Sequence, residues 1–289
     1  YAFLYNLNDD TNKLNNVGKT KILNLNELLE YLSNSKSDMS VLAVSGYHSL
    51  IFLENIIENT DNLGIASKEA IVSAGHIFNK KRYFEKTNIF PIDSEHFSLF
   101  KYFYNNKNIK DINKITITAS GGPFYKKKFN TLTNVKFSDA INHPKWKMGY
   151  KNSIDSATLV NKCLELIEAH YLFDIPYNKL DILVHPQAIV HSFVEYNNFT
   201  SHFNLFKNDM KIPILNFLKF SNCTYKFNNH NLNLSRSELS SLEFEKINLS
   251  TFPIYKIFKK IDKNRPENLI KFNIGNEYAV NLFKNKVIR

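Results

Sequence analysis

The stretch VLAVSGYHSLIFLENIIENTDNLGIASKEAIVSAGHIF, residues 41–78, decides the fold. Residues 41–44 form a short apolar run typical of a buried strand, and a Ser-Gly turn follows it. A helical pattern over 50–57 leads to a second apolar run at 63–66 and a second helical pattern over 68–78. Short strands that alternate with helices in this way predict a parallel, doubly wound sheet.

After residue 92 the expected elements follow a different order. We expect strands over 114–119, 180–184 and 189–196, and helices over 156–173, 252–261 and 276–286. Either Asp155 or Ser156 is expected to be the N-cap of the 156–173 helix. The polar residues 125–150 predict a long loop of the kind that often covers a binding site. The Asn- and Ser-rich residues 221–250 predict a linker or an irregular arm.

Length, composition and charge narrow the class of protein. The 289 residues, 43% of them hydrophobic, suffice for one large core or two smaller ones. Cys163 and Cys223 are no disulfide framework, which favours a reducing compartment. The net charge of +10 comes from scattered lysines, which argues against a nucleic-acid surface, and no apolar run is long enough to span a membrane. Because the chain opens on Tyr1 rather than Met, we expect a fragment.

Two groups of residues have the chemistry of a metal and anion site. In extended backbone Asp93 and Glu95 would point the same way, and paired carboxylates suit a hard divalent cation; a solvated turn is the simpler alternative. On the expected helix Asn161, Lys162 and Glu165 share one face and could hold a metal and an anion. An ordinary surface Lys–Glu pair is the alternative there. Glu168 extends this stripe, toward solvent or just behind the ligands.

Weaker signals surround these groups. The Gly-Gly pair after Ser120 frees backbone N–H groups for an anion, although a plain turn is commoner. Residues 143–149 contain the only tryptophan, Trp146, which could cover a ligand. Lys68 near a helix N-terminus could meet a phosphate or a carbonyl, or only solvent. The histidines at 185 and 191 could bind metal but lack the spacing of a zinc site, which favours a position behind the ligands or a structural role.

Taken together and in this order, the groups resemble the 1-deoxy-D-xylulose 5-phosphate reductoisomerase family. The resemblance runs from about Leu42 to Val280. Its most specific blocks are PIDSEH (91–96), TASGGPF (118–124), HPKWKMG (143–149), DSAT with NK (155–162) and HPQ with VHS (185–192).

The resemblance implies roles for individual residues. Asp93, Glu95 and Glu165 match ligands for Mn²⁺ or Mg²⁺, with Co²⁺ also acceptable, and together with Lys68 they match the catalytic positions. The substrate-binding positions match Ser94, Ser120, His143, Trp146, Ser156, Asn161 and Lys162. The cofactor-binding positions match Ser67, Lys68, Glu69, Met148 and Gly149.

The sequence departs from the family pattern at three places. Its eight glycines nowhere form the Gly-rich phosphate loop that opens a dinucleotide-binding domain. Ser67 stands where the family has Asn, and Cys163 stands where it has Gly, so the side chain at 163 is expected to crowd the helix packing. The chain also stops at Arg289, before the family's last helices.

The resemblance further implies an α/β fold with an incomplete, doubly wound NADPH-binding sheet in residues 1–92. An α+β catalytic domain would occupy 93–220 with a flexible loop at 120–150, then a linker at 221–251 and the start of a C-terminal helical domain at 252–289.

The implied activity is the NADPH- and metal-dependent conversion of 1-deoxy-D-xylulose 5-phosphate to 2-C-methyl-D-erythritol 4-phosphate. The partners would be a sugar phosphate and a second copy of the chain. The compartment would be the cytoplasm in a bacterium or a plastid-type organelle in a eukaryote. Two alternatives stay open: a metal-dependent isomerase or lyase with no redox step, and a degenerate homologue without catalytic activity.

Overall fold

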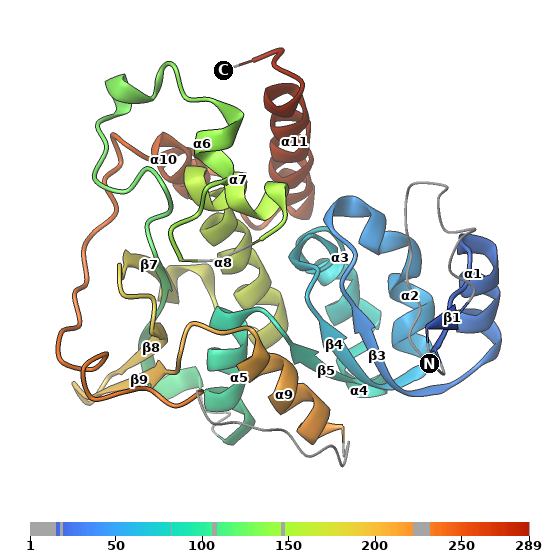
Figure 1. Cartoon of the computed structure of the whole chain (residues 1–289). Coiled ribbons are helices and arrows are strands. Elements are labelled where there is room, and N and C mark those ends of the chain that lie inside the picture. Colours follow the sequence, from blue (N-terminus) through green and yellow to red (C-terminus); the bar gives the residue numbers. More distant parts are fainter. Residues whose placement is uncertain are drawn as a thin grey trace.

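A computed structural model of the chain describes residues 16–17, 20–81, 83–105, 109–145, 148–221 and 232–288. The expectations for Trp146 and Cys223 lie outside these residues. Figure 1 shows a smaller α/β layer built from the first part of the chain, beside a larger part that contains a second sheet and most of the helices.

The first part is a parallel sheet with the strand order β3-β4-β5. Its elements are β1 (Asn16–Val17), β2 (Thr20–Lys21), α1 (Leu25–Asn34), β3 (Ser37–Leu42), α2 (Leu50–Glu58), β4 (Thr60–Ile65), α3 (Lys68–Lys81), α4 (Tyr83–Lys86) and β5 (Asn88–Pro91). The predicted strand–helix–strand pattern and its parallel pairing are confirmed. The first strand runs from Ser37 to Leu42 rather than over 41–44, because its polar start pairs with Thr60 at the start of β4.

The second sheet is mixed and has the order β7-β6-β8-β9. Its strands are β6 (Ile112–Ala119), β7 (Leu180–Val184), β8 (Val190–Tyr196) and β9 (Ser201–Leu205). β6 pairs with β7 in parallel and with β8 antiparallel. The helices α5 (Ser94–Asn105) and α8 (Val160–Phe173) pack against this sheet. The three strands predicted here are confirmed; β6 starts two residues earlier than expected, β8 starts one residue later, and β7 has the expected bounds.

Of the remaining helices, α10 confirms the helix expected over 252–261, and the others differ from the sequence-based expectations. They are α6 (Phe137–Ile141), α7 (Tyr150–Thr158), α9 (Lys211–Phe220), α10 (Pro253–Lys260) and α11 (Pro266–Lys284), with short 3-10 turns at Gly46–Ser49, Ile109–Asp111, Phe129–Leu132 and Tyr177–Lys179. The expected 125–150 loop is therefore interrupted by helical turns. α11 begins at Pro266 instead of residue 276, because a proline fits the first turn of a helix.

The helix expected over 156–173 is confirmed from Val160 to Phe173, but its continuation back to residue 156 is wrong. Two helices, α7 and α8, meet at Leu159, whose backbone is left-handed with φ 69°. Asp155 and Ser156 lie inside α7 and cap neither helix. No glycine or proline marks this break in the sequence, so the periodic pattern continued through it.

A close contact between α3 and α8 joins the two parts of the chain. A Cβ atom at Gly75 would lie 2.4 Å from the ring of Tyr171, so only glycine allows the two helices to approach this closely. One continuous core of buried apolar side chains runs from Leu28 on α1, through α3 and α8, to Leu269 on α11. None of the described helices combines the length and apolar character needed to cross a membrane.

Candidate metal and phosphate site

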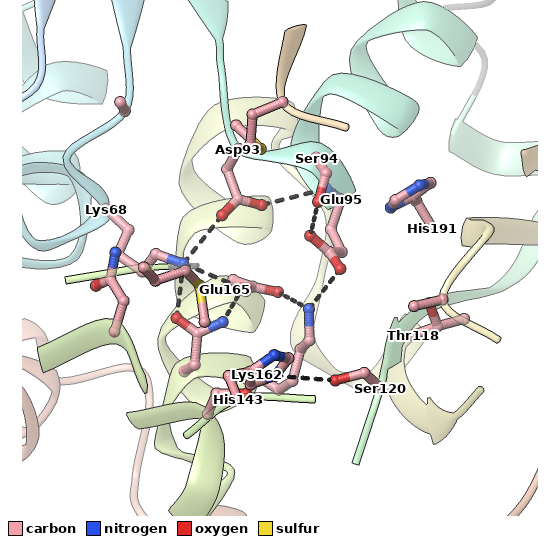
Figure 2. A pocket seen from close by; sticks show the side chains of 17 residues that line it. Lys68, Asp93, Ser94, Glu95, Thr118, Ser120, His143, Lys162, Glu165 and His191 are labelled. Carbon is pink, nitrogen blue, oxygen red and sulfur yellow. Dashed lines mark hydrogen bonds and ion pairs between the residues drawn. The ribbon is translucent and has the colours of Figure 1, made fainter. Parts of the chain in front are cut away.

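A cavity of about 220 Å³ lies where α3, α5, β6, α7 and α8 meet. Most of the predicted site residues line it: Lys68, Asp93, Ser94, Glu95, Ser120, His143, Met148, Ser156, Asn161, Lys162 and Glu165. Figure 2 shows Glu165 near the centre of this group, with Asp93 and Glu95 on one side and Ser120 and His143 on the other. Residues that are far apart in the sequence thus surround one space.

Three carboxylates converge at this cavity. Asp93, Glu95 and Glu165 each place an oxygen within 4.8 Å of the others. Asp93 precedes α5, where its Oδ1 accepts the backbone N–H of Glu95 at 3.2 Å, and Glu95 lies in the first helical turn. The expected extended backbone over 93–95 is therefore wrong. A helix start brings the two side chains together instead, because Asp93 satisfies a free N–H group there.

Two buried lysines lie among these carboxylates (Figure 2). Lys68 Nζ lies 3.0 Å from Asp93 Oδ2, 3.1 Å from Glu165 Oε1 and 2.8 Å from Asn161 Oδ1. Lys162 Nζ lies 2.6 Å from Glu95 Oε1 and 2.7 Å from Glu165 Oε2. Burial opposes the charge on Lys68, but Asp93 and Glu165 outweigh it and raise its pKa well above the usual value.

The donor set fits a divalent cation. Its three carboxylates against two ammonium groups leave a net negative charge, and carboxylate oxygens are the ligands that Mg²⁺ and Mn²⁺ prefer. Burial disfavours ionisation of Asp93, but Lys68 dominates and lowers the pKa of that carboxyl well below its usual range. Asp93 is therefore ionised at neutral pH and available as a ligand.

His96 supports the carboxylates from behind. Its ring is fully buried, with Nδ1 3.1 Å from Asp93 Oδ1 and 3.3 Å from Glu168 Oε2. Its Nε2 lies 2.8 Å from the backbone oxygen of Glu165. Burial disfavours the imidazolium, but Glu168 and Asp93 raise the pKa of His96 to about 9. Of the two expectations for Glu168, the position behind the ligands is correct, since its side chain is buried.

A polar wall faces the carboxylates. Ser120 follows β6, and its Oγ lies 3.2 Å from His143 Nε2. At Gly122, φ is +65° and a Cβ would lie 2.8 Å from the carbonyl oxygen of Ser156, so glycine lets this turn reach α7. Burial, with the nearby charge of Lys162, lowers the pKa of His143 to about 4. The wall therefore offers hydroxyl and imidazole groups beside one ammonium group, a set suited to a phosphate.

The residues matched to cofactor binding are placed differently. Met148 lines the cavity, whereas Ser67, Glu69 and Gly149 are outside its described lining. Ser67 Oγ contacts the backbone oxygens of Val44 at 2.6 Å and Leu42 at 3.2 Å, which fixes the start of α3 beside the end of β3. Glu69 is buried, 2.7 Å from Lys151 Nζ.

The side chain at 163 was expected to crowd the helix packing, but Cys163 does not interrupt α8. Its side chain is fully buried in the main core, and α8 continues through it. Burial raises the pKa of its thiol far above the usual value, so the group is neutral. Position 163 therefore behaves as an ordinary apolar core position.

Sequence reasoning missed Thr118 and Asn152, which also line the cavity, and favoured for His191 a position behind the ligands or a structural role. Thr118 lies on β6, two residues before Ser120, and this spacing along a strand could have indicated it. Asn152 lies on α7, a helix that was not expected. His191 stacks on Phe206 with ring centroids 3.8 Å apart, and burial lowers its pKa to about 3, so it is neutral.

Two family models match the chain. One, described as the 1-deoxy-D-xylulose 5-phosphate reductoisomerase C-terminal domain, matches residues 89–173. The other, described as the DXP reductoisomerase C-terminal domain, matches residues 205–289.

Curated relatives with the same description extend over more of the chain. The 1-deoxy-D-xylulose 5-phosphate reductoisomerase of Pelagibacter ubique is 36% identical over 293 residues, which covers 96% of this chain and 74% of that protein. The Clostridium tetani protein of the same name is 41% identical over 256 residues, or 89% of this chain and 66% of that protein. The chain spans slightly less than two thirds of the length of the Clostridium relatives.

Solved structures of reductoisomerases have a fold similar to that of this chain. The structure titled DOX-P reductoisomerase in complex with NADPH, fosmidomycin and magnesium has a TM-score of 0.83 at 33% identity, covering 93% of this chain and 68% of that one. The Zymomonas mobilis reductoisomerase in complex with NADPH has a TM-score of 0.80 at 32% identity, covering 93% of this chain and 69% of that one.

Proposed function

Because this chain belongs to the 1-deoxy-D-xylulose 5-phosphate reductoisomerase family, we propose that the whole protein converts 1-deoxy-D-xylulose 5-phosphate to 2-C-methyl-D-erythritol 4-phosphate, a step of isoprenoid biosynthesis. The carbon skeleton is rearranged to an aldehyde, which is then reduced. The observation that carries the proposal is the convergence of Asp93, Glu95 and Glu165 within 4.8 Å, next to a wall of hydroxyl, imidazole and ammonium groups.

In this proposal Asp93, Glu95 and Glu165 hold Mn²⁺ or Mg²⁺, with Co²⁺ as a further option. The cation supplies Lewis acidity for the substrate's carbonyl and hydroxyl oxygens, and NADPH supplies the hydride. His96 keeps Asp93 in place through its contact at 3.1 Å, and its backbone contact to Glu165 ties α5 to α8. Two of the ligands are thus held by the same buried imidazole.

The polar wall is assigned to the substrate. Ser120, Ser156, Asn161 and Lys162 bind its phosphate, while Ser94 and His143 contact the rest of the sugar chain; all six line the cavity. Lys162 supplies the positive charge that a phosphate requires. Trp146 keeps its proposed role in substrate binding. Lys68 and Met148 face the nicotinamide side, with Ser67, Glu69 and Gly149 as supports of that side. The sugar phosphate is then held with its reacting carbons between the carboxylates and the nicotinamide.

The division into partial cofactor domain, catalytic domain, linker and partial helical domain at 92, 220 and 251 remains part of this proposal. So does the assembly of the whole protein as a homodimer. The proposed compartment is the cytoplasm in a bacterium, or a plastid-type organelle in a eukaryote.

Binding of Mn²⁺, followed by electron paramagnetic resonance on the intact protein, tests the carboxylate site. We expect Glu165→Gln to weaken Mn²⁺ binding by roughly 100-fold or more, since even changes to residues around metal ligands cost roughly 10–100-fold. Glu195→Gln is the matched control, because Glu195 lies on β8 and does not line the described cavity. Equal Mn²⁺ affinity in the wild type and Glu165→Gln would disprove the metal site.

Turnover separates the redox reaction from a lyase without a redox step. We expect one NADPH to be oxidised for each substrate consumed, and no turnover after chelation of the divalent cation. A solved relative is described as holding fosmidomycin together with NADPH and magnesium, so we expect fosmidomycin to bind this protein. Substrate consumption without NADPH oxidation would favour the lyase, and metal binding without any turnover would favour a degenerate homologue.

A further inference from the structure

A buried charged cluster of Glu69, Lys151 and Asp155 lies behind the cavity, and only Glu69 among them has been given a role, as a support of the nicotinamide side. Lys151 Nζ lies 2.7 Å from Glu69 Oε1 and 2.7 Å from Asp155 Oδ2. The three side chains are between 1% and 10% exposed. We infer that Lys151 is a positioning residue that sets the distance between the two walls of the substrate cavity; this inference rests on the proposed function.

Each member of the cluster is a sequence neighbour of a residue that lines the cavity. Glu69 follows Lys68, Lys151 precedes Asn152, and Asp155 precedes Ser156. Lys68 lies on the side of the cavity that carries the three carboxylates, where it contacts Asp93. Ser156 lies on the opposite side, in the polar wall beside Gly122. The ammonium group of Lys151 on α7 therefore joins α7, which also carries Ser156, to α3, which carries Lys68 and Glu69.

The cluster continues into α11. Asn276 Nδ2 donates to Asp155 Oδ1 at 2.8 Å, so both carboxylate oxygens of Asp155 are occupied. One turn earlier, Asn273 is buried, and its Nδ2 contacts Ser73 Oγ on α3 at 3.4 Å. α11 thus contacts both helices that Lys151 joins, and Figure 1 shows it standing beside α7. The positions of α3 and α7 are consequently fixed from two directions.

Burial of the charged cluster around Lys151 costs free energy, so its presence calls for a specific benefit. Removing charges from water costs several kcal/mol per ion, and buried ion pairs are often no more stabilising than apolar residues of the same size. Their best-attested benefit is to fix one relative placement of the elements that carry them. Burial opposes the charge on Lys151, but Asp155 and Glu69 raise its pKa, so the ammonium persists at neutral pH.

Steady-state kinetics of Lys151→Met in the intact protein test the inference. We expect KM for 1-deoxy-D-xylulose 5-phosphate to rise roughly 10- to 100-fold, as expected when a binding group is displaced by about 1 Å. The fall in kcat should be smaller, because Ser156 contacts a phosphate that does not react. Lys114→Met is the control: it breaks a more exposed pair with Asp181 at 2.6 Å, away from the cavity, and KM should stay within about twofold of the wild type.

A double-mutant cycle distinguishes positioning from a general loss of structure. If Lys151 acts through Ser156, the variant Lys151→Met/Ser156→Ala should have nearly the same KM as Ser156→Ala alone. Additive effects on KM would overturn the inference. If Lys151→Met does not fold, Asp155→Asn replaces it in the same cycle, since it keeps the shape and the contact with Asn276.

A measurement without substrate separates this inference from the proposed function. We expect amide hydrogen exchange to accelerate in Lys151→Met at both 66–70 and 152–158, and at neither segment in Lys114→Met. Exchange that changes at one segment only, or at none, refutes the positioning role even if the enzyme is active. Wild-type protein that shows no turnover refutes the proposed function, while the exchange result still decides the role of Lys151.

Discussion

Replacement of Gly75 by alanine tests the helix contact on which the site depends. Gly75 lies in the middle of α3, where alanine favours the helix by about 1 kcal/mol over glycine. The added Cβ would lie 2.4 Å from Tyr171 Cγ and Cδ2 and 2.8 Å from its Cβ. Tyr171 Cβ is attached to the backbone of α8, so relief requires the helices to separate, and overpacking of this kind costs about 3 kcal/mol. We expect a net loss of about 2 kcal/mol in the free energy of unfolding.

Gly275→Ala is the matched control for this prediction. Gly275 lies inside α11, and a Cβ there would meet nothing within 4 Å. We expect this variant to be more stable than the wild type by roughly 0.5–1 kcal/mol, the ordinary gain of alanine over glycine in a helix. Both changes are measured by urea unfolding followed by circular dichroism. Gly75→Ala should also weaken Mn²⁺ binding, because Glu165 is on α8 and Lys68 is on α3. Equal stabilisation by the two substitutions would refute the close-contact argument.

Two further predictions concern a histidine and an aromatic cluster. The pKa of buried His191 is about 3, below its ordinary value of 6.5, so its contribution to stability is present above pH 6.5 and is lost as the pH falls below it. Between pH 6 and 4, the free energy of unfolding of the wild type should fall more steeply than that of His191→Gln, by up to about 1.4 kcal/mol per pH unit. Urea unfolding of both proteins at each pH measures this difference. Phe90→Ala should cost about 3–5 kcal/mol, because Phe90 is 1% exposed and packs on Phe217 at 5.4 Å. Phe199→Ala, at a fully exposed residue, should change stability by less than about 0.5 kcal/mol; equal losses at 90 and 199 would contradict this account of the core.

Local patterns predicted those parts of the structure that depend on local geometry. The apolar runs around 41–44 and 63–66 identified neighbouring parallel strands. The run in β4 is buried as expected of a strand covered on both faces, whereas β3 is largely exposed and only Leu42 at its end is buried. Helical spacing placed Asn161, Lys162 and Glu165 on one face, and all three now line the cavity. These predictions required only the period of a helix or the pleat of a strand.

Predictions failed where a distant contact overrides the local preference. Leu159 adopts a left-handed backbone although nothing in its neighbourhood favours one, and α7 therefore turns away from α8. That turn directs Lys151 toward Glu69 and brings Ser156 to the Gly122 turn. The start of α5 at Ser94 was missed for a similar reason, since an Asp-Ser-Glu segment fits an extended strand end as well as a helix N-terminus.

The site therefore depends on helix packing more than on any one motif. Asp93 and Glu95 come from the start of α5, Glu165 from α8 and Lys68 from α3. Each carboxylate alone fits a solvated surface group, and only burial against the two lysines makes its position specific. A sequence that kept every charged residue but replaced Gly75 with a larger residue would retain the motifs and lose the distances between them. The glycine at the α3–α8 contact is thus as much a requirement of the proposed cation site as the three carboxylates are.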